Sequence, residues 1–157
     1  MKRAGWKECA RFWPMSEKLN TVTAREQDGV SRAVLLWLKG YAPEIEFEYL
    51  PPERSGMMLT SVQSAYKTAQ YIDGGYAAQY PFGVMYRALP TDSEERLDVE
   101  SLLNEMGAWA EENPPDLGEG MTVTSVERTT PAGLIARYED LTEDYQILLT
   151  INYEVEV

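Results

Sequence analysis

Carboxylates are the side chains of this sequence that are most able to carry out chemistry. Glu44, Glu46 and Glu48 alternate along a short segment, so a β-strand would present all three on one face about 7 Å apart. Such a face could bind a hard cation, take part in acid–base catalysis, or form an acidic wall facing solvent or a channel. We favour the acidic wall, and we take Glu44, Glu46 and Glu48 as a candidate channel face.

Two further groups of acidic residues could bind calcium or magnesium. The first group comprises Glu111, Glu112, Asp116 and Glu119, and it lacks the ordered ligand spacing of an EF-hand loop. The second group comprises Glu139, Asp140, Glu143 and Asp144, and it surrounds a predicted turn, where exposed acids are common. We predict no metal-binding residues.

Other catalytic chemistry finds little support. The chain has no histidine, which removes the commonest general base, a common metal ligand and every triad that contains imidazole. Its single cysteine, Cys9, has no imidazole partner and forms no internal disulfide, in keeping with synthesis in a reducing cytosol. The sequence lacks a GxxxxGK[S/T] phosphate-binding loop. We predict no catalytic residues, no cofactor and no enzymatic activity; a small carboxylate-based enzyme or metal-binding domain stays open as an alternative.

Net charge narrows the range of partners. The chain of 157 residues carries a net charge of −12, although its first fourteen residues are basic. Nucleic-acid affinity depends on Lys and Arg side chains that neutralise phosphates, so specific DNA or RNA binding is not expected. An acidic surface is compatible with DNA that passes without binding. The longest apolar run, residues 33–38, is far shorter than the ~20 residues of a membrane-spanning helix, so we expect no membrane association.

A tyrosine-rich hairpin is the main candidate for an assembly surface. Asp73-Gly74-Gly75 predicts a tight turn between arms at residues 65–72 and 76–89, because glycine accepts positive φ. Aromatic and methionine side chains are enriched at interface cores, but tyrosine in strands also packs in protein cores, and both readings stay open. The candidate subunit interface comprises Met57, Met58, Tyr66, Tyr71, Asp73, Gly74, Gly75 and Tyr76.

Two helices are predicted. Thr23 and Glu26 have capping-box spacing before a helix at residues 24–39, where Gly40 would provide a left-handed stop. Asp92 and Glu95 have the same spacing before a second helix that ends at residue 113. Two apolar stripes at helical spacing mark the buried sides: Val30, Ala33, Val34, Trp37 and Leu38, then Val99, Leu102, Leu103, Met106, Trp109 and Ala110.

Seven strands are predicted at residues 44–50, 57–62, 65–72, 76–89, 121–128, 132–139 and 145–157. The last has the clearest alternation, with Tyr145, Ile147 and Leu149 at the start of its apolar face. Pro81 should mark an edge or a bulge. The predicted fold class is α+β, with two helices packed on one face of a mostly antiparallel sheet in the order α-β-β-β-β-α-β-β-β.

The domain prediction divides the chain near residue 15. Residues 16–157 should form a single α+β domain, a normal size for one hydrophobic core. Residues 1–15 are an N-terminal extension, either an arm that packs on a neighbouring subunit through its aromatic residues or a product of an upstream start site before Met15. Both interpretations stay open.

Several segments resemble a family of structural proteins from phages and prophages of Gram-positive bacteria. These are residues 30–39, 47–52 and 55–59, the string Tyr71-Ile-Asp-Gly-Gly-Tyr76, and residues 120–130. Members are labelled minor capsid proteins and are similar to tail terminator, or tail completion, proteins of long-tailed phages. The resemblance covers about residues 16–157 and consists of family-like strings without a chemical signature.

The resemblance implies a virion protein, made in the host cytoplasm, that forms a ring at the head–tail junction. The ring, typically a hexamer, would cap the tail tube, end its polymerisation, meet the head–tail connector or adaptor protein and leave a DNA channel. The expected partners are therefore other copies of the chain, the tail tube protein and the connector. Another neck or tail component, such as an adaptor or a tube subunit, stays open.

Overall fold

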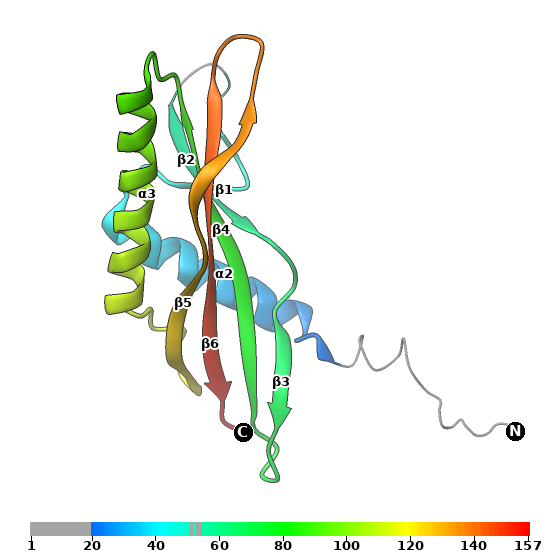
Figure 1. The fold of residues 1–157 in the computed structure, drawn as a ribbon. Coiled ribbons are helices and arrows are strands. Elements are labelled where there is room, and N and C mark those ends of the chain that lie inside the picture. Colours follow the sequence, from blue (N-terminus) through cyan, green and yellow to red (C-terminus); the bar gives the residue numbers. More distant parts are fainter. Residues whose placement is uncertain (1–19, 51, 53–54) are drawn as a thin grey trace, which may run out of the picture.

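The computed structural model of the protein describes residues 20–50, 52 and 55–157 (Figure 1). The predictions made for residues 1–15, Cys9 among them, lie outside the described residues. Within these described residues, two helices and six strands occur in the order α2-β1-β2-β3-β4-α3-β5-β6, so the predicted α+β class is confirmed. The order differs from the predicted one by a single strand.

Both helices begin at the predicted capping residues. The N–H of Glu26 donates to Thr23 Oγ1 (3.1 Å) ahead of α2 (Ala24–Tyr41), and the N–H of Glu95 donates to Asp92 Oδ1 (2.9 Å) ahead of α3 (Ser93–Glu112). The predicted stop at Gly40 is wrong, because α2 continues to Tyr41 and is capped at Ala42. α3 ends before Asn113, as predicted.

The sheet is mostly antiparallel, in the spatial order β1-β2-β4-β6-β5, with β3 also paired to β4. β4 (Tyr76–Ala88) and β6 (Glu143–Val155) form its long centre and pair over their full lengths. β2 (Gly56–Ser61) and β3 (Tyr66–Gln70) pair with the two ends of β4 on the same side. The other side is formed by β5 (Met121–Arg137) against β6. β1 (Glu46–Phe47) runs parallel to β2.

Pro81 lies within β4, a central strand of the sheet, but at Pro81 this strand is paired on the β6 side only, so it is locally an edge. The carbonyl of Pro81 accepts from the N–H of Val62 (3.4 Å), in the interval between the ends of β2 and β3. In a strand, the N and C=O of one residue point to the same side. The missing N–H of Pro81 therefore faces the one interval of β4 where no strand is paired on that side, which explains how proline is tolerated.

Two strand predictions need correction. The two strands predicted at residues 121–128 and 132–139 are one continuous strand, β5 (Met121–Arg137), whose register shifts on both sides of Thr130 absorb Pro131 without a break. Residues 44–50 contain only the two-residue β1. There Ile45 is fully buried, but Phe47 and Tyr49 are exposed, so the three do not share a buried face.

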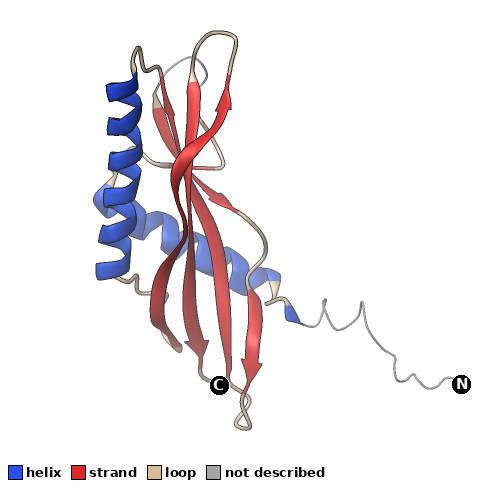
Figure 2. Ribbon diagram, viewed as in Figure 1, coloured by secondary structure: helices blue, strands red, loops and turns tan. Residues whose placement is uncertain are grey.

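Both helices pack on the same face of the sheet, as predicted (Figure 2). On β6, Ile147 lies beside Gly107 of α3, and the Tyr153 hydroxyl reaches Glu26 of α2. Residues 147 and 153 have the same parity and therefore point to the same face. The helices meet where Trp37 stacks on Trp109, with ring centroids 5.2 Å apart. The core lies between the helices and the odd-numbered residues of β6.

Within the described residues, neither helix is long and apolar enough to cross a membrane.

Candidate assembly surfaces

The predicted hairpin interface is divided between buried and exposed positions. Met57 and Gly75 are buried, while Met58, Tyr66 and Tyr76 are partly buried. Tyr71, Asp73 and Gly74 are exposed at the turn. The turn has the expected chemistry, because Gly74 has a φ of +96° and Asp73 Oδ1 accepts from the N–H of Gly75 (2.9 Å). The surface that this hairpin offers to a partner is therefore its tip.

We call Tyr71, Ile72 and Val157 the β3–β4 tip. Ile72 is fully exposed and Val157 nearly so. A side chain built at Gly74 would lie 3.7 Å from Val157, so the chain terminus and the turn are adjacent. This tip is an apolar projection at one end of the sheet, beside the position marked C in Figure 1.

A second apolar projection lies at the other end of the sheet, where the β5–β6 turn is drawn in orange in Figure 1. Its exposed apolar side chains, which we call the β5–β6 tip, are Leu134, Ile135, Tyr138 and Leu141. Leu141 is 68% exposed and has a φ of +74°. The sequence analysis did not identify this surface, because it predicts residues 132–139 as a strand and assigns no exposed apolar face to them.

Two buried acids form the base of the β5–β6 tip. Glu143 accepts from the hydroxyl of Tyr145 (2.7 Å) and from Nε of Arg137 (2.7 Å) and Arg96 (3.2 Å). Asp144 receives two bonds from the Arg87 guanidinium, at 2.8 and 2.9 Å, and one from the Tyr138 hydroxyl (2.8 Å). The sequence prediction of ordinary exposed acids here is wrong for Glu143 and Asp144.

The electrostatics of Glu143 show how burial is tolerated. Desolvation raises the pKa of Glu143, but the hydrogen bonds from Tyr145, Arg137 and Arg96 together outweigh it and hold the pKa below its ordinary value. For Tyr145, burial and then the bond to Glu143 raise the pKa to about 12. The network holds α3, β5 and β6 together through one carboxylate.

A second carboxylate connects α2 to the sheet. The hydroxyls of Tyr153 (2.7 Å) and Tyr76 donate to the Glu26 carboxylate. Burial, followed by the bond to Glu26, raises the pKa of Tyr76 to about 12 and also raises that of Tyr153. The capping-box prediction gave Glu26 a different role, since its carboxylate was expected to bond to the backbone. Tyr76 is thus a structural residue of the hairpin.

The candidate channel glutamates do not lie on one regular strand face. Glu46 is exposed on β1, whereas Glu48 has a φ of +57° and its carboxylate accepts from the Thr60 hydroxyl (3.1 Å) and the Ser61 N–H (2.9 Å). Glu44 lies before β1, at a shallow pocket. The three carboxylates remain near one edge of the sheet, without the even spacing of the predicted strand.

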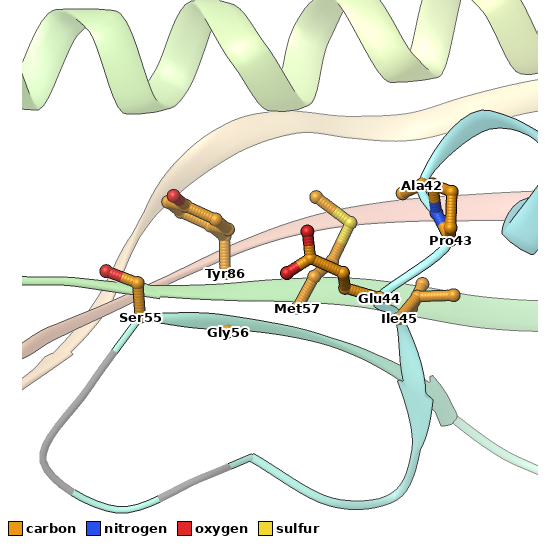
Figure 3. Close-up of a pocket in the computed structure, with 8 residues that line it drawn as sticks. All are labelled: Ala42, Pro43, Glu44, Ile45, Ser55, Gly56, Met57 and Tyr86. Atoms are coloured by element: carbon orange, nitrogen blue, oxygen red, sulfur yellow. The ribbon is translucent and has the colours of Figure 1, made fainter.

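The pocket at Glu44 has a volume of about 190 Å³ and lies between the end of α2 and the start of β2 (Figure 3). The side chains of Met57, Tyr86 and Glu44 are among those that line it, with the Glu44 carboxylate between the other two in this view (Figure 3). Among the described residues that line it, only Glu44 carries a carboxylate. In the described part of the chain, no three His, Cys, Asp or Glu side chains are grouped closely enough to bind a metal ion.

Comparisons with known proteins identify no family. No family model matches the chain, and no curated protein matches it. A solved structure of a protein that is named only by a sequence identifier is 18% identical, with a TM-score of 0.46; the match covers 83% of this chain and 96% of the other. At that TM-score the likeness carries no argument about function.

Proposed function

We propose that this protein is a structural component of a phage virion that forms a ring, with six copies expected, at the head–tail junction. The ring caps the tail tube, ends tube polymerisation and leaves a central channel through which DNA passes. The proposal starts from the resemblance of residues 16–157 to tail terminator proteins.

The observation that carries the proposal is the presence of two different apolar projections at opposite ends of one subunit. The β3–β4 tip and the β5–β6 tip both expose large apolar side chains, among them Ile72 and Leu141. Exposed apolar clusters mark interaction sites. A subunit with unlike contact surfaces at its two ends suits a layer between unlike partners, here the tail tube on one side and the connector on the other.

The charge of the chain supports passage of DNA. A ring of six copies would carry several tens of negative charges, and like charges repel across a Debye length of about 8 Å at physiological salt. We keep Glu44, Glu46 and Glu48 as the candidate channel residues. Their proximity at one sheet edge, exposed in the case of Glu46, is compatible with that role.

The test is to add the purified chain to polymerising tail tube protein and to image the products by electron microscopy. We expect tubes that stop growing, each with one ring at a single end. Rings repeated along the tube would indicate a tube subunit, and binding to the connector without binding to tubes would indicate an adaptor. Either result overturns the capping function, as does failure to bind both.

A further inference from the structure

We propose that the outer side of α2 in one copy packs antiparallel against the outer side of α3 in the next copy. This inference rests on the proposed ring and names a lateral contact that would close it. The contact is built from two helix surfaces with opposite charge and the same residue spacing.

The outer side of α2 carries a basic stripe, formed by Arg25, Arg32 and Lys39 with Leu36 between the last two. These positions are seven residues apart, so they align along the helix over about 21 Å. The buried residues Val30, Val34 and Leu38 lie on the opposite side of the helix. Leu36 is 73% exposed, an apolar side chain in the middle of the charged row.

The outer side of α3 carries an acidic stripe of matching dimensions. Asp98, Glu105 and Glu112 are also seven residues apart and are all exposed. Leu102 lies between the first two and is 39% exposed, although the sequence pattern placed it in the core. Leu97 beside the stripe is 63% exposed.

An antiparallel arrangement aligns both the charges and the leucines. It places Arg25 opposite Glu112, Arg32 opposite Glu105 and Lys39 opposite Asp98. In that register the position opposite Leu36 is Ser101, so Leu36 lies within one residue of Leu102, about 1.5 Å along the helix. A parallel arrangement would also pair the charges, but it would place Leu36 opposite Trp109, whose ring is already stacked on Trp37. Antiparallel packing is therefore the register that brings the two exposed leucines together.

Intramolecular contacts leave these stripes available. Arg32 pairs with Asp28 on its own helix, a highly exposed ion pair of the kind that contributes little. Lys39 donates to the carbonyl of Ile45 (3.0 Å), which uses one of the three N–H groups of its ammonium. Both helices lie on the same side of the sheet (Figure 2). Arg25 and Arg32 on α2 and all three acids of the α3 stripe are exposed.

A second copy of the chain is the occupant that the charges favour. The chain is acidic overall, so two copies repel except where a basic surface meets an acidic one. Each copy offers one basic and one acidic stripe. A contact between unlike surfaces is heterologous and leaves one stripe of each kind free, so it continues to the next copy until a ring closes.

The test is a charge exchange measured by sedimentation velocity at low and high salt. We would compare the wild type with R25E/R32E, with D98K/E105K and with the chain that carries all four substitutions. Each two-site variant should self-associate on the order of tenfold or more weakly, because like charges then face each other. The four-site variant keeps a net charge of −12 and should regain association, and a mixture of the two two-site variants should associate as well.

The matched control is E119K/E156K, which changes the net charge as D98K/E105K does but lies outside both helices. Circular dichroism checks that every variant is folded. The helix contact is overturned if the two-site variants associate as strongly as the wild type. It is also overturned if the four-site variant does not associate, or if the wild type stays monomeric up to about millimolar concentration. The tube-capping function is judged separately by the tube-binding assay. If the four-site variant regains association but forms only a closed dimer, the helix contact is supported and the ring is overturned.

Discussion

Glu143 and Asp144 are adjacent on β6 and point to opposite faces of the sheet. On the helix side, Glu143 is held by Arg96 of α3 and Arg137 of β5. On the other side, Asp144 is held by Arg87 of β4. Buried carboxylates are costly unless they are paired and hydrogen-bonded. Both are paired here, so two neighbouring residues join the two strands of the β5–β6 hairpin and fix its position relative to α3 and β4.

Replacing Glu143 by Gln should lower the free energy of unfolding by about 1–3 kcal/mol at pH 7, since the charge-assisted bonds to Arg137 and Arg96 are lost. The folded-state pKa of Glu143 is depressed, so its contribution is present above the unfolded value of about 4.3 and is lost as pH falls through the folded pKa. Urea titrations between about pH 2 and 7 should therefore show a flatter acid limb for E143Q. Exposed Glu139→Gln is the control, expected within about 0.5 kcal/mol of wild type; an equal loss in both would contradict the assignment.

The tyrosines that bond to Glu26 predict a loss of stability in alkali. The pKa of Tyr76 is raised to about 12, and that of Tyr153 is raised as well. A raised folded-state pKa gives stability that is complete below the unfolded value of about 10 and is lost as pH rises through the folded value. Tyr153→Phe should cost about 1 kcal/mol at pH 7 and reduce the slope of stability against pH above about pH 10. Chemical denaturation over this pH range measures both effects. If stability falls with pH as steeply in the variant as in the wild type, the role of Tyr153 is contradicted. Tyr49→Phe, at an exposed position, is the control for the loss at pH 7.

At the scale of elements, α3 approaches the sheet through a glycine. A Cβ built at Gly107 would lie 2.6 Å from Cδ of Arg128 on β5 and 2.8 Å from Cδ1 of Ile147 on β6. Gly107 is buried, and a Cβ there would require the Arg128 and Ile147 side chains, or the helix itself, to shift. The helix can therefore lie directly on β5 and β6, with its buried side formed by Leu103, Met106 and Ala110 on either side of the contact.

Gly107→Ala should destabilise the protein by about 1–3 kcal/mol, because the added methyl group forces the helix away from the sheet. Gly40→Ala in α2 is the matched control, since a Cβ there meets nothing within 4 Å. That control should be neutral or stabilising by up to about 1 kcal/mol, the usual gain when alanine replaces glycine in a helix. Thermal unfolding of both variants is the measurement, and equal stability of the two would show that the close approach has no energetic consequence.

Local chemistry made the helices and the long strands predictable. Thr23 and Asp92 cap helices because their side-chain oxygens accept from backbone N–H groups three residues later, a relation contained within one turn. The prediction of a strand over residues 44–50 is wrong because the backbone there depends on distant groups. Glu48 adopts a positive φ, and its carboxylate accepts hydrogen bonds from Thr60 and Ser61. The role of Glu26 was equally hidden, since Tyr76 and Tyr153 lie 50 and 127 residues further along the chain. For Glu143, the hidden partner is Arg96 of α3, 47 residues away.

At the scale of the whole molecule, the sheet places its exposed apolar groups at its two ends. Sequence analysis selected Tyr71 and the turn at Asp73 as interface candidates, and both lie at the exposed β3–β4 tip. It did not find Leu134, Ile135 or Leu141, because strand alternation does not reveal how far a hairpin extends beyond the body that covers it. How far the β5–β6 hairpin extends beyond α3 can be known only from the three-dimensional arrangement of α3, β5 and β6.

Ile72→Asp and Leu141→Asp should leave the thermal midpoint within about 2 °C of wild type, because neither exposed side chain is part of the core. Each should nevertheless reduce binding to tail tubes or to the connector protein, since an aspartate places a charge in the apolar contact. Co-sedimentation with tubes and with connector measures this. Gln63→Asp, on an exposed loop, is the control; binding unchanged in both tip variants would remove the tips from the assembly surface.

The irregular register of β5 has a consequence for the protein before it assembles. β5 forms one edge of the sheet, and its pairing with β6 shifts register at four places. A bulged edge presents its unpaired backbone groups unevenly, which makes it a poor template for another chain to add to. Subunits at high concentration before assembly should therefore resist growth into amyloid-like fibrils, even though both ends of the sheet expose apolar side chains.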